Sequence, residues 1–316
     1  MDNLAFSLNA TLPVFLLMAL GLVLRKLRVI DDVFASKMNG FVFSVCLPVL
    51  LFSDIAVVDL DTGWNGRLVL FCLGATCASI ALVSALALLL RSTSERGEFI
   101  QGSYRSSAAL LGVAIMQNMY GEADLAALMI IGAVPLYNVA AVFVLTLTAP
   151  GTSGEERLSA GLKRAVRGVV TNPILIGIAA GFAYAATGLP MPGLLGSLTG
   201  SIGGLATPLG LLAMGAMFDF RRAAQRIKPA LAASSLKLVG LVAAFLPVAV
   251  ACGFRGEELA VILVMLGSGT TVSSFVMARA SGHEGVLSST IVMMTTFGSA
   301  FTLTGWVFVL RSLGLV

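Results

Sequence analysis

Residues 103–121, SYRSSAALLGVAIMQNMYG, are long enough to span a membrane but too polar and too broken for a plain lipid-facing helix. A second such stretch, residues 265–282, reads MLGSGTTVSSFVMARASG and places a run of Gly, Ser and Thr inside an apolar region. Backbone at membrane depth departs from regular helix only where protein or a water-filled cavity satisfies its polar groups. Two interrupted spans in one membrane chain therefore predict a solute-binding site at the interruptions.

The composition of the whole chain is that of a polytopic helical membrane protein. The 316 residues are 58% hydrophobic and only 11% charged, and the mean hydropathy is +0.97. The charges stand between apolar runs of about 18–25 residues, the length of a helix that crosses the hydrocarbon core. The net charge of +4 comes from basic residues scattered over short loops. The lipid bilayer is therefore an expected partner, and nucleic acid is not.

The reactive side chains do not form the arrangements that enzymes need. Cys46, Cys72, Cys77 and Cys252 all lie in apolar runs without a CxxC pair, and His283 is the single histidine. This pattern argues against a metal site, a disulfide and a Ser-His-Asp triad. We expect no enzyme, no catalytic residue, no metal and no cofactor.

Ten spans account for the apolar runs, and the basic residues orient them. The predicted spans are 10–24, 34–53, 67–90, 99–120, 124–148, 168–187, 203–219, 230–252, 256–280 and 286–310. The loops on one side then carry sixteen Lys and Arg residues, and those on the other side carry three. Because the basic side stays in the cytoplasm, we expect a multi-pass protein of the bacterial inner membrane with both termini outside.

An offset of 160 residues relates the two halves of the chain. It carries Pro13 onto Pro173, Gly21 onto Gly181 and Pro48 onto Pro208. Each half holds five spans, an odd number, so the second half must insert upside down relative to the first. The predicted fold is all-α, with ten transmembrane helices in two inverted five-helix repeats, residues 1–148 and 168–316, joined by a cytoplasmic linker, 149–167. The broken helices 4 and 9 occupy matching places in the two repeats.

Hydroxyl, amide and glycine positions of the interrupted spans and of span 5 are the candidate binding residues, because they offer hydrogen-bond donors without burying a full charge. They are Ser106, Ser107, Gly112, Gln117, Asn118, Asn138, Gly269, Thr270, Thr271, Ser273 and Ser274. Arg105 is a candidate partner for an anion, but Arg105 and Lys237 could equally snorkel to the cytoplasmic face. Ordinary helix packing is the alternative for the small residues, and an interhelical hydrogen bond is the alternative for Asn138.

An ordered set of motifs resembles the auxin efflux carrier (AEC) family of permeases, bacterial type. The set is LPVFLLMALGLVLRKLRVID (12–31), MNGFVFSVCLPVLLF (38–52), YRSSAALLGV (104–113), YGEADLAALMII (120–131), VPLYNV (134–139), TNPILIGIAAG (171–181) and TPLGLLAMGAMF (207–218). The resemblance implies a fold like that of bile-acid sodium symporters, with a scaffold from spans 1, 2, 6 and 7. It implies a transport domain from spans 3–5 and 8–10, with spans 4 and 9 crossing, and a homodimer. Ser107 stands where the family often has Asn, and the chain lacks the family's prolines at the crossing.

The resemblance also implies the function, a secondary active transporter or facilitator of small organic anions by elevator-type alternating access. The substrates would be mono- or dicarboxylates, either auxin-like or malonate- or malate-like. A sodium-dependent bile-acid-like symporter and a non-transporting membrane sensor of the same fold are the alternatives. None of the sixteen acids lies in the middle of a span, so a buried-carboxylate proton relay is not supported. A Na⁺ site of carbonyls and hydroxyls and a facilitator driven by membrane potential both stay open.

Overall fold

A computed structural model describes residues 2–57, 65–90, 92–108, 116, 119–120, 124–150, 167 and 170–316. All regular elements in these residues are helices. Within the described ranges, six helices are long and apolar enough to cross a bilayer: Asp32–Ala56, Gly66–Ala87, Leu125–Leu147, Gly193–Ala216, Ile227–Ala251 and Val286–Ser312. The predicted all-helical, multi-pass class is confirmed. The ten-helix inverted repeat stays a prediction.

Three of these six helices are composite. The first joins α2 (Asp32–Phe41), the π-helical turn η1 (Val42–Cys46) and α3 (Leu47–Ala56). The fourth joins α10 (Gly193–Gly204) and α11 (Ala206–Ala216). The fifth joins α13 (Ile227–Ser235), the π-helical turn η3 (Leu236–Gly240) and α14 (Leu241–Ala251). π-Helical turns inside α-helices frequently mark functional positions.

The remaining helices complete the order along the chain. They are α1 (Asp2–Lys26), α4 (Gly66–Ala87), α5 (Thr93–Tyr104), α7 (Asp124–Leu147), α9 (Pro173–Ala185), α12 (Phe220–Gln225), α15 (Gly256–Gly267), α16 (Ser273–Ala280) and α17 (Val286–Ser312). The helix predicted at 203–219 begins at Gly193, because the Gly- and Ser-rich segment 193–204 is helical despite its weak helix propensity. Helix α10 packs against α3, and this tertiary contact compensates for its weak helix propensity.

The span predicted at 256–280 is interrupted, as expected from its Gly, Ser and Thr content. Helix α15 ends at Gly267, Ser268 is extended (φ −70°, ψ 154°), and α16 begins at Ser273. Helix α5 likewise stops at Tyr104, and Arg105 is extended (φ −71°, ψ 143°). Residues 109–115 lie outside the described residues, so the continuation of the predicted span 4 is not described.

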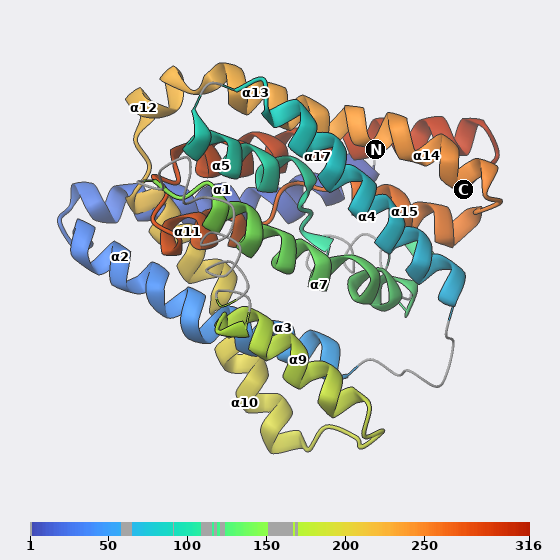
Figure 1. Cartoon of the computed structure of the whole chain (residues 1–316), viewed down its shortest axis with the longest axis horizontal. Helices are drawn as coiled ribbons and strands as arrows, with labels where there is room; N and C mark the ends of the chain where they lie inside the picture. The colour runs from blue at the N-terminus through green and yellow to red at the C-terminus, as the bar shows by residue number, and fades with distance from the viewer. Residues whose placement is uncertain are drawn as a thin grey trace.

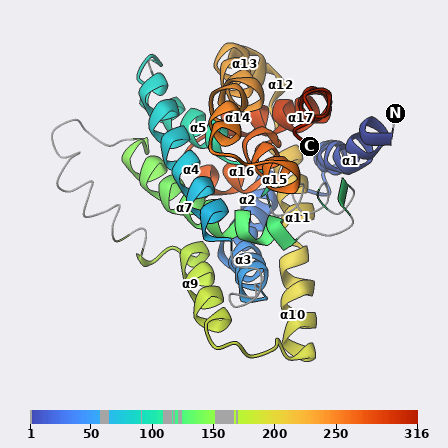
Figure 2. The same cartoon turned by 90° about the vertical axis from the view of Figure 1, so that its right-hand side faces the viewer.

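The helices gather into two groups. Figure 1 shows α3, α9 and α10 extending away from α4, α5, α13, α14 and α17, and Figure 2 shows the same separation from the side. Helix α1 packs on α11, and α3 packs on α9 and α10. Helix α16 contacts α2, η1 and α11 on one side and α5, α7 and α17 on the other, so the interruption that precedes α16 lies where the two groups meet.

Glycines permit close contacts between α1 and α11 and between α9 and α3, at matching positions in the two halves of the chain. A Cβ atom on Gly21 of α1 would collide with the carbonyl of Leu212 in α11. A Cβ atom on Gly181 of α9 would lie 3.0 Å from the carbonyl oxygen of Phe52 in α3. The offset of 160 residues carries one pair onto the other. This reciprocity supports the predicted repeat.

Candidate functional site

The two interrupted segments lie side by side and are joined by hydrogen bonds. The backbone N–H of Ser107 donates to the carbonyl of Gly269 (2.9 Å). The Thr270 hydroxyl donates to the carbonyl of Gly102 (2.6 Å), and the Gln101 amide donates to the carbonyl of Ser274 (2.9 Å). Polar groups that a broken helix would leave unpaired are thereby satisfied by the other break.

Helix α17 holds the second break in place from behind. A Cβ atom on Gly269 would lie 2.9 Å from the Cα atom of Thr296, so only glycine allows this close approach. The backbone N–H of Thr270 donates to the Thr295 hydroxyl (2.9 Å). The position of the break is therefore fixed by contacts with α17 and not by proline.

A cavity of about 230 Å³ opens in front of the two breaks, between them and α3, α9 and α11. Its polar lining comes from Asp54, Arg105, Ser106, Ser107, Tyr137, Asn138, Thr207, Thr270, Thr271, Ser273 and Thr296. Its apolar lining comes from η1 and α3 (Val42, Leu47, Leu50 and Leu51) and from Ala108, Val134, Ile174, Ala206, Val272 and Val276. An apolar cavity with a few convergent polar groups is the usual form of a small-molecule site.

Arg105 is buried at the cavity and does not snorkel to the surface. Its side chain is 2% exposed, and its Nη2 atom donates to Asn138 Oδ1 (3.0 Å) and to Ser273 Oγ (2.8 Å). Its Nη1 atom lies 2.9 Å from the sulfur of Met277. Within the described part of the chain, Nε has no hydrogen-bond partner and no ion pair involves Arg105. The hydrogen-bond partners of the guanidinium are thus neutral groups, and no carboxylate of the described residues lies within ion-pair distance of it.

Lys237 is likewise buried inside the protein. It is 0% exposed, and its Nζ atom donates to the Ser106 hydroxyl and to the carbonyl of Leu266 (2.7 Å). Ser106 in turn donates to the carbonyl of Met265. The hydroxyl of Ser106 is therefore already engaged, although the residue lines the cavity.

The structure divides the predicted site residues into three groups. Arg105, Ser106, Ser107, Asn138, Thr270, Thr271 and Ser273 line one cavity. Gly269 and Ser274 lie behind it, where the first permits packing and the second offers its carbonyl to Gln101. Gly112, Gln117 and Asn118 fall outside the described residues.

Asp54 is a cavity residue that the sequence analysis did not select as a candidate. It lines the cavity from α3, and its Oδ2 atom is buried without a hydrogen-bond partner among the described residues. The acid lies far from the interrupted spans in the sequence, so only the packing of α3 against them reveals the position. A signal was present nonetheless, because Asp54 stands two residues after the apolar run that ends at Phe52.

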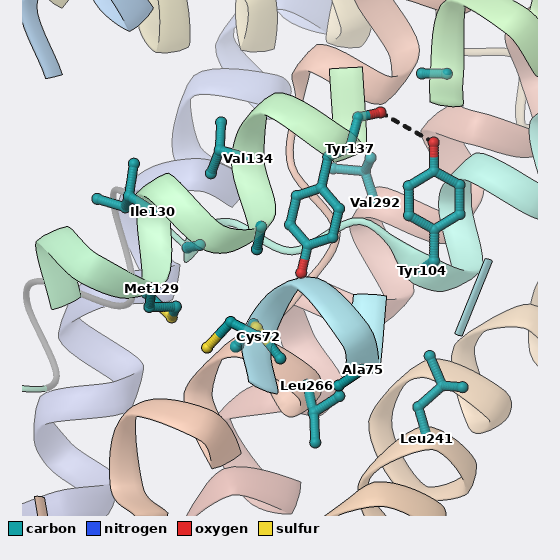
Figure 3. Close-up of a cluster of buried hydrophobic side chains, with 14 of the residues drawn as sticks. Cys72, Ala75, Tyr104, Met129, Ile130, Val134, Tyr137, Leu241, Leu266 and Val292 are labelled. Carbon is teal, nitrogen blue, oxygen red and sulfur yellow. Dashed lines mark hydrogen bonds between the residues drawn. The ribbon is translucent and has the colours of Figure 1, made fainter. Parts of the chain in front are cut away.

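Two tyrosines connect the first break to α7 behind the cavity. The hydroxyl of Tyr104 donates to the carbonyl of Tyr137 (3.0 Å), and their ring centroids are 5.8 Å apart. Figure 3 shows this bond and the Tyr137 ring directed toward α4, near Cys72. Helix α7 thus carries both Tyr137 and Asn138 at fixed positions relative to Arg105.

Comparison with known proteins assigns the chain to a protein family. A family model described as "Membrane transport protein" matches residues 6–307, nearly the whole chain. The chain belongs to this family. The resemblance to the auxin efflux carrier family is thereby confirmed. An uncharacterized transporter from Methanothermobacter thermautotrophicus is 26% identical over 312 residues, which cover 96% of this chain and 98% of that protein. Membership of the membrane transport protein family and this likeness support a membrane transporter.

Proposed function

We propose that this member of the membrane transport protein family carries small organic anions, and that Arg105 binds the anionic group. The observation that carries the proposal is the guanidinium of Arg105, which is buried at the cavity. Among the described residues, it takes part in no ion pair. An uncompensated buried charge is costly, and an anion in the cavity would relieve that cost. A guanidinium also matches a carboxylate in geometry.

The neighbouring hydroxyls and amide complete the proposed anion site. Ser273 and Asn138 hold the guanidinium from behind, while Thr271 and Ser107 line the cavity. Helix α16 begins beside the cavity, and a helix N-terminus favours negative charge. A cavity of about 230 Å³ suits a small mono- or dicarboxylate, either auxin-like or malonate- or malate-like.

We further propose elevator-type alternating access. The scaffold would be α1, α2, α3, α9, α10 and α11, and the transport domain would hold the remaining described helices. The cavity lies between these two sets, so a sliding transport domain would carry the anion past the scaffold. A homodimer in the inner membrane, formed through the scaffold, with all termini outside, belongs to the same proposal.

The test is uptake of a labelled mono- and dicarboxylate panel into proteoliposomes, with sodium, proton and potential gradients imposed separately. We expect saturable flux for at least one acid. Arg105→Gln should reduce apparent affinity by about 10- to 100-fold, because a hydrogen bond to a charged group contributes roughly 1.5–3 kcal/mol. The exposed Arg311 provides the matched control, and Arg311→Gln should leave uptake unchanged.

Flux that does not respond to Arg105→Gln would contradict the assigned anion partner. Folded protein without flux for any acid would favour the sensor. A strict sodium requirement would instead favour a bile-acid-like symporter.

A further inference from the structure

The ammonium group of Lys237 lies where two helices end. Its Nζ atom is 2.7 Å from the carbonyl oxygen of Leu266 and 3.4 Å from those of Met265 and Tyr104, and it also donates to the Ser106 hydroxyl. Tyr104 is the last residue of α5, and the other two carbonyls belong to the last turn of α15. Three of the four oxygens therefore come from the C-terminal ends of the interrupted helices.

This environment is one that attracts a cation. The last carbonyls of a helix lack intrahelical partners, and they carry the negative end of the helix dipole. In transporters with broken helices, such half-helix C-terminal ends and unwound carbonyls hold the coupling Na⁺ or H⁺. Here two such ends converge on one point, and a side chain supplies the positive charge.

The helix that carries Lys237 places its side chain between the ends of α5 and α15. It lies in the π-helical turn η3, on the helix α13–α14 that packs against α5, α15 and α17. The residue is fully buried, and none of the ion pairs formed within the described ranges involves it. The partners of the ammonium are therefore oxygens of the two interrupted segments, which we call the crossing.

We propose that the Lys237 ammonium is a tethered substitute for a coupling cation, so that the crossing needs no Na⁺. Of the two coupling modes that the sequence left open, this favours the facilitator driven by membrane potential over the sodium site. The statement about coupling rests on the proposed transport function, whereas the statement about the cation position does not.

The first experiment measures thermal unfolding of the purified full-length protein in detergent, without any organic anion. Sodium chloride is compared with choline chloride at equal ionic strength. The unfolding midpoint of the wild type should be the same in both salts. Lys237→Ala should lower the midpoint in choline chloride by about 5 °C, and sodium should restore part of the loss because the oxygen cage is then open to an ion.

Two further variants separate a cation position from a merely structural contact. Lys237→Met fills the space without charge, so its midpoint should fall in both salts without recovery by sodium. Lys228→Ala removes an exposed lysine from the same composite helix and should behave like the wild type.

Several results would overturn the inference. A wild-type midpoint that rises in sodium relative to choline would show that an ion still binds. A Lys237→Ala protein that is destabilised but indifferent to sodium would reduce Lys237 to a structural role. If Lys237→Ala and Lys237→Met fail to fold, the comparison of the wild-type unfolding midpoints in sodium chloride and choline chloride still tests whether the protein binds sodium.

A second experiment separates this inference from the proposed function. Wild-type uptake at a fixed membrane potential should be equal with sodium and with choline, and a sodium-dependent rate would overturn the inference about coupling. An absence of uptake for every acid, with the expected salt responses of Lys237→Ala, would refute the proposed function and leave the cation position supported.

Discussion

At the scale of single residues, Asn138 positions the guanidinium that we assign to the anion. Its Oδ1 atom accepts from Arg105, and its amide nitrogen donates to the carbonyl of Val134 (2.9 Å). We expect Asn138→Ala to raise the KM for uptake about tenfold by loosening Arg105. Asn138→Asp should raise it further, because the new carboxylate would neutralise Arg105 in place of the anion. Equal KM values for the two variants would contradict an anion bound at Arg105.

Asp54 places a second charge on the same cavity, and this charge has the wrong sign for an anion. Its carboxylate lines the cavity from α3, opposite the interrupted segments. Like charges near a protein surface repel by roughly 1 kcal/mol or more. Asp54→Asn should therefore lower the KM for a dicarboxylate several-fold. The exposed Asp32 serves as a control, and Asp32→Asn should leave the KM as it is. A higher KM in Asp54→Asn would show that the acid helps binding.

At the scale of the elements, two adjacent glycines of α10 test the close packing of α10 on α3. A Cβ atom on Gly203 would lie 2.9 Å from the Cα atom of Leu50, whereas one on Gly204 would meet nothing within 4 Å. Gly203→Leu should destabilise the protein by about 1–3 kcal/mol through overpacking. Gly204→Leu should be near neutral in the same thermal-unfolding measurement. Equal losses would show that helix propensity, and not packing, governs both positions.

At the scale of the whole molecule, a cross-link between the proposed scaffold and transport domain tests the elevator. A Cβ atom on Gly210 of α11 would lie 3.0 Å from Val272 Cγ1, at the start of α16. With the native cysteines replaced, the pair Gly210→Cys and Val272→Cys should form a disulfide under oxidation. Uptake should then stop and return on reduction, because the two sets can no longer slide.

The matched control for this cross-link lies within the scaffold. The side-chain oxygens of Ser53 in α3 and Thr199 in α10 lie 3.4 Å apart. The pair Ser53→Cys and Thr199→Cys should cross-link without stopping uptake, since both helices would move together. Continued uptake through the Gly210–Val272 cross-link would argue against relative sliding of the two sets.

The local chemistry of the chain made much of this architecture predictable. Apolar runs of membrane length identify the class, because hydrocarbon excludes unpaired backbone groups. The cluster of Gly, Ser and Thr at 267–274 indicated a break where α15 ends and α16 begins. The predicted start of this helix at residue 203 was wrong, because the helix begins at Gly193. Glycine has a weak intrinsic helix propensity, so its helical state here depends on tertiary packing.

A multi-pass helical membrane protein with an interrupted late span could be predicted from the sequence, because hydropathy, span length and glycine content act over a few neighbouring residues. The tertiary structure alone decided that Arg105 and Lys237 are buried and that Asp54 faces the same cavity as Arg105. Those contacts join residues far apart along the chain, such as Lys237 with Ser106 and Arg105 with Ser273. Such distances are set by how helices pack, and the local pattern of residues around each charge could not distinguish a buried cation from a snorkelling one.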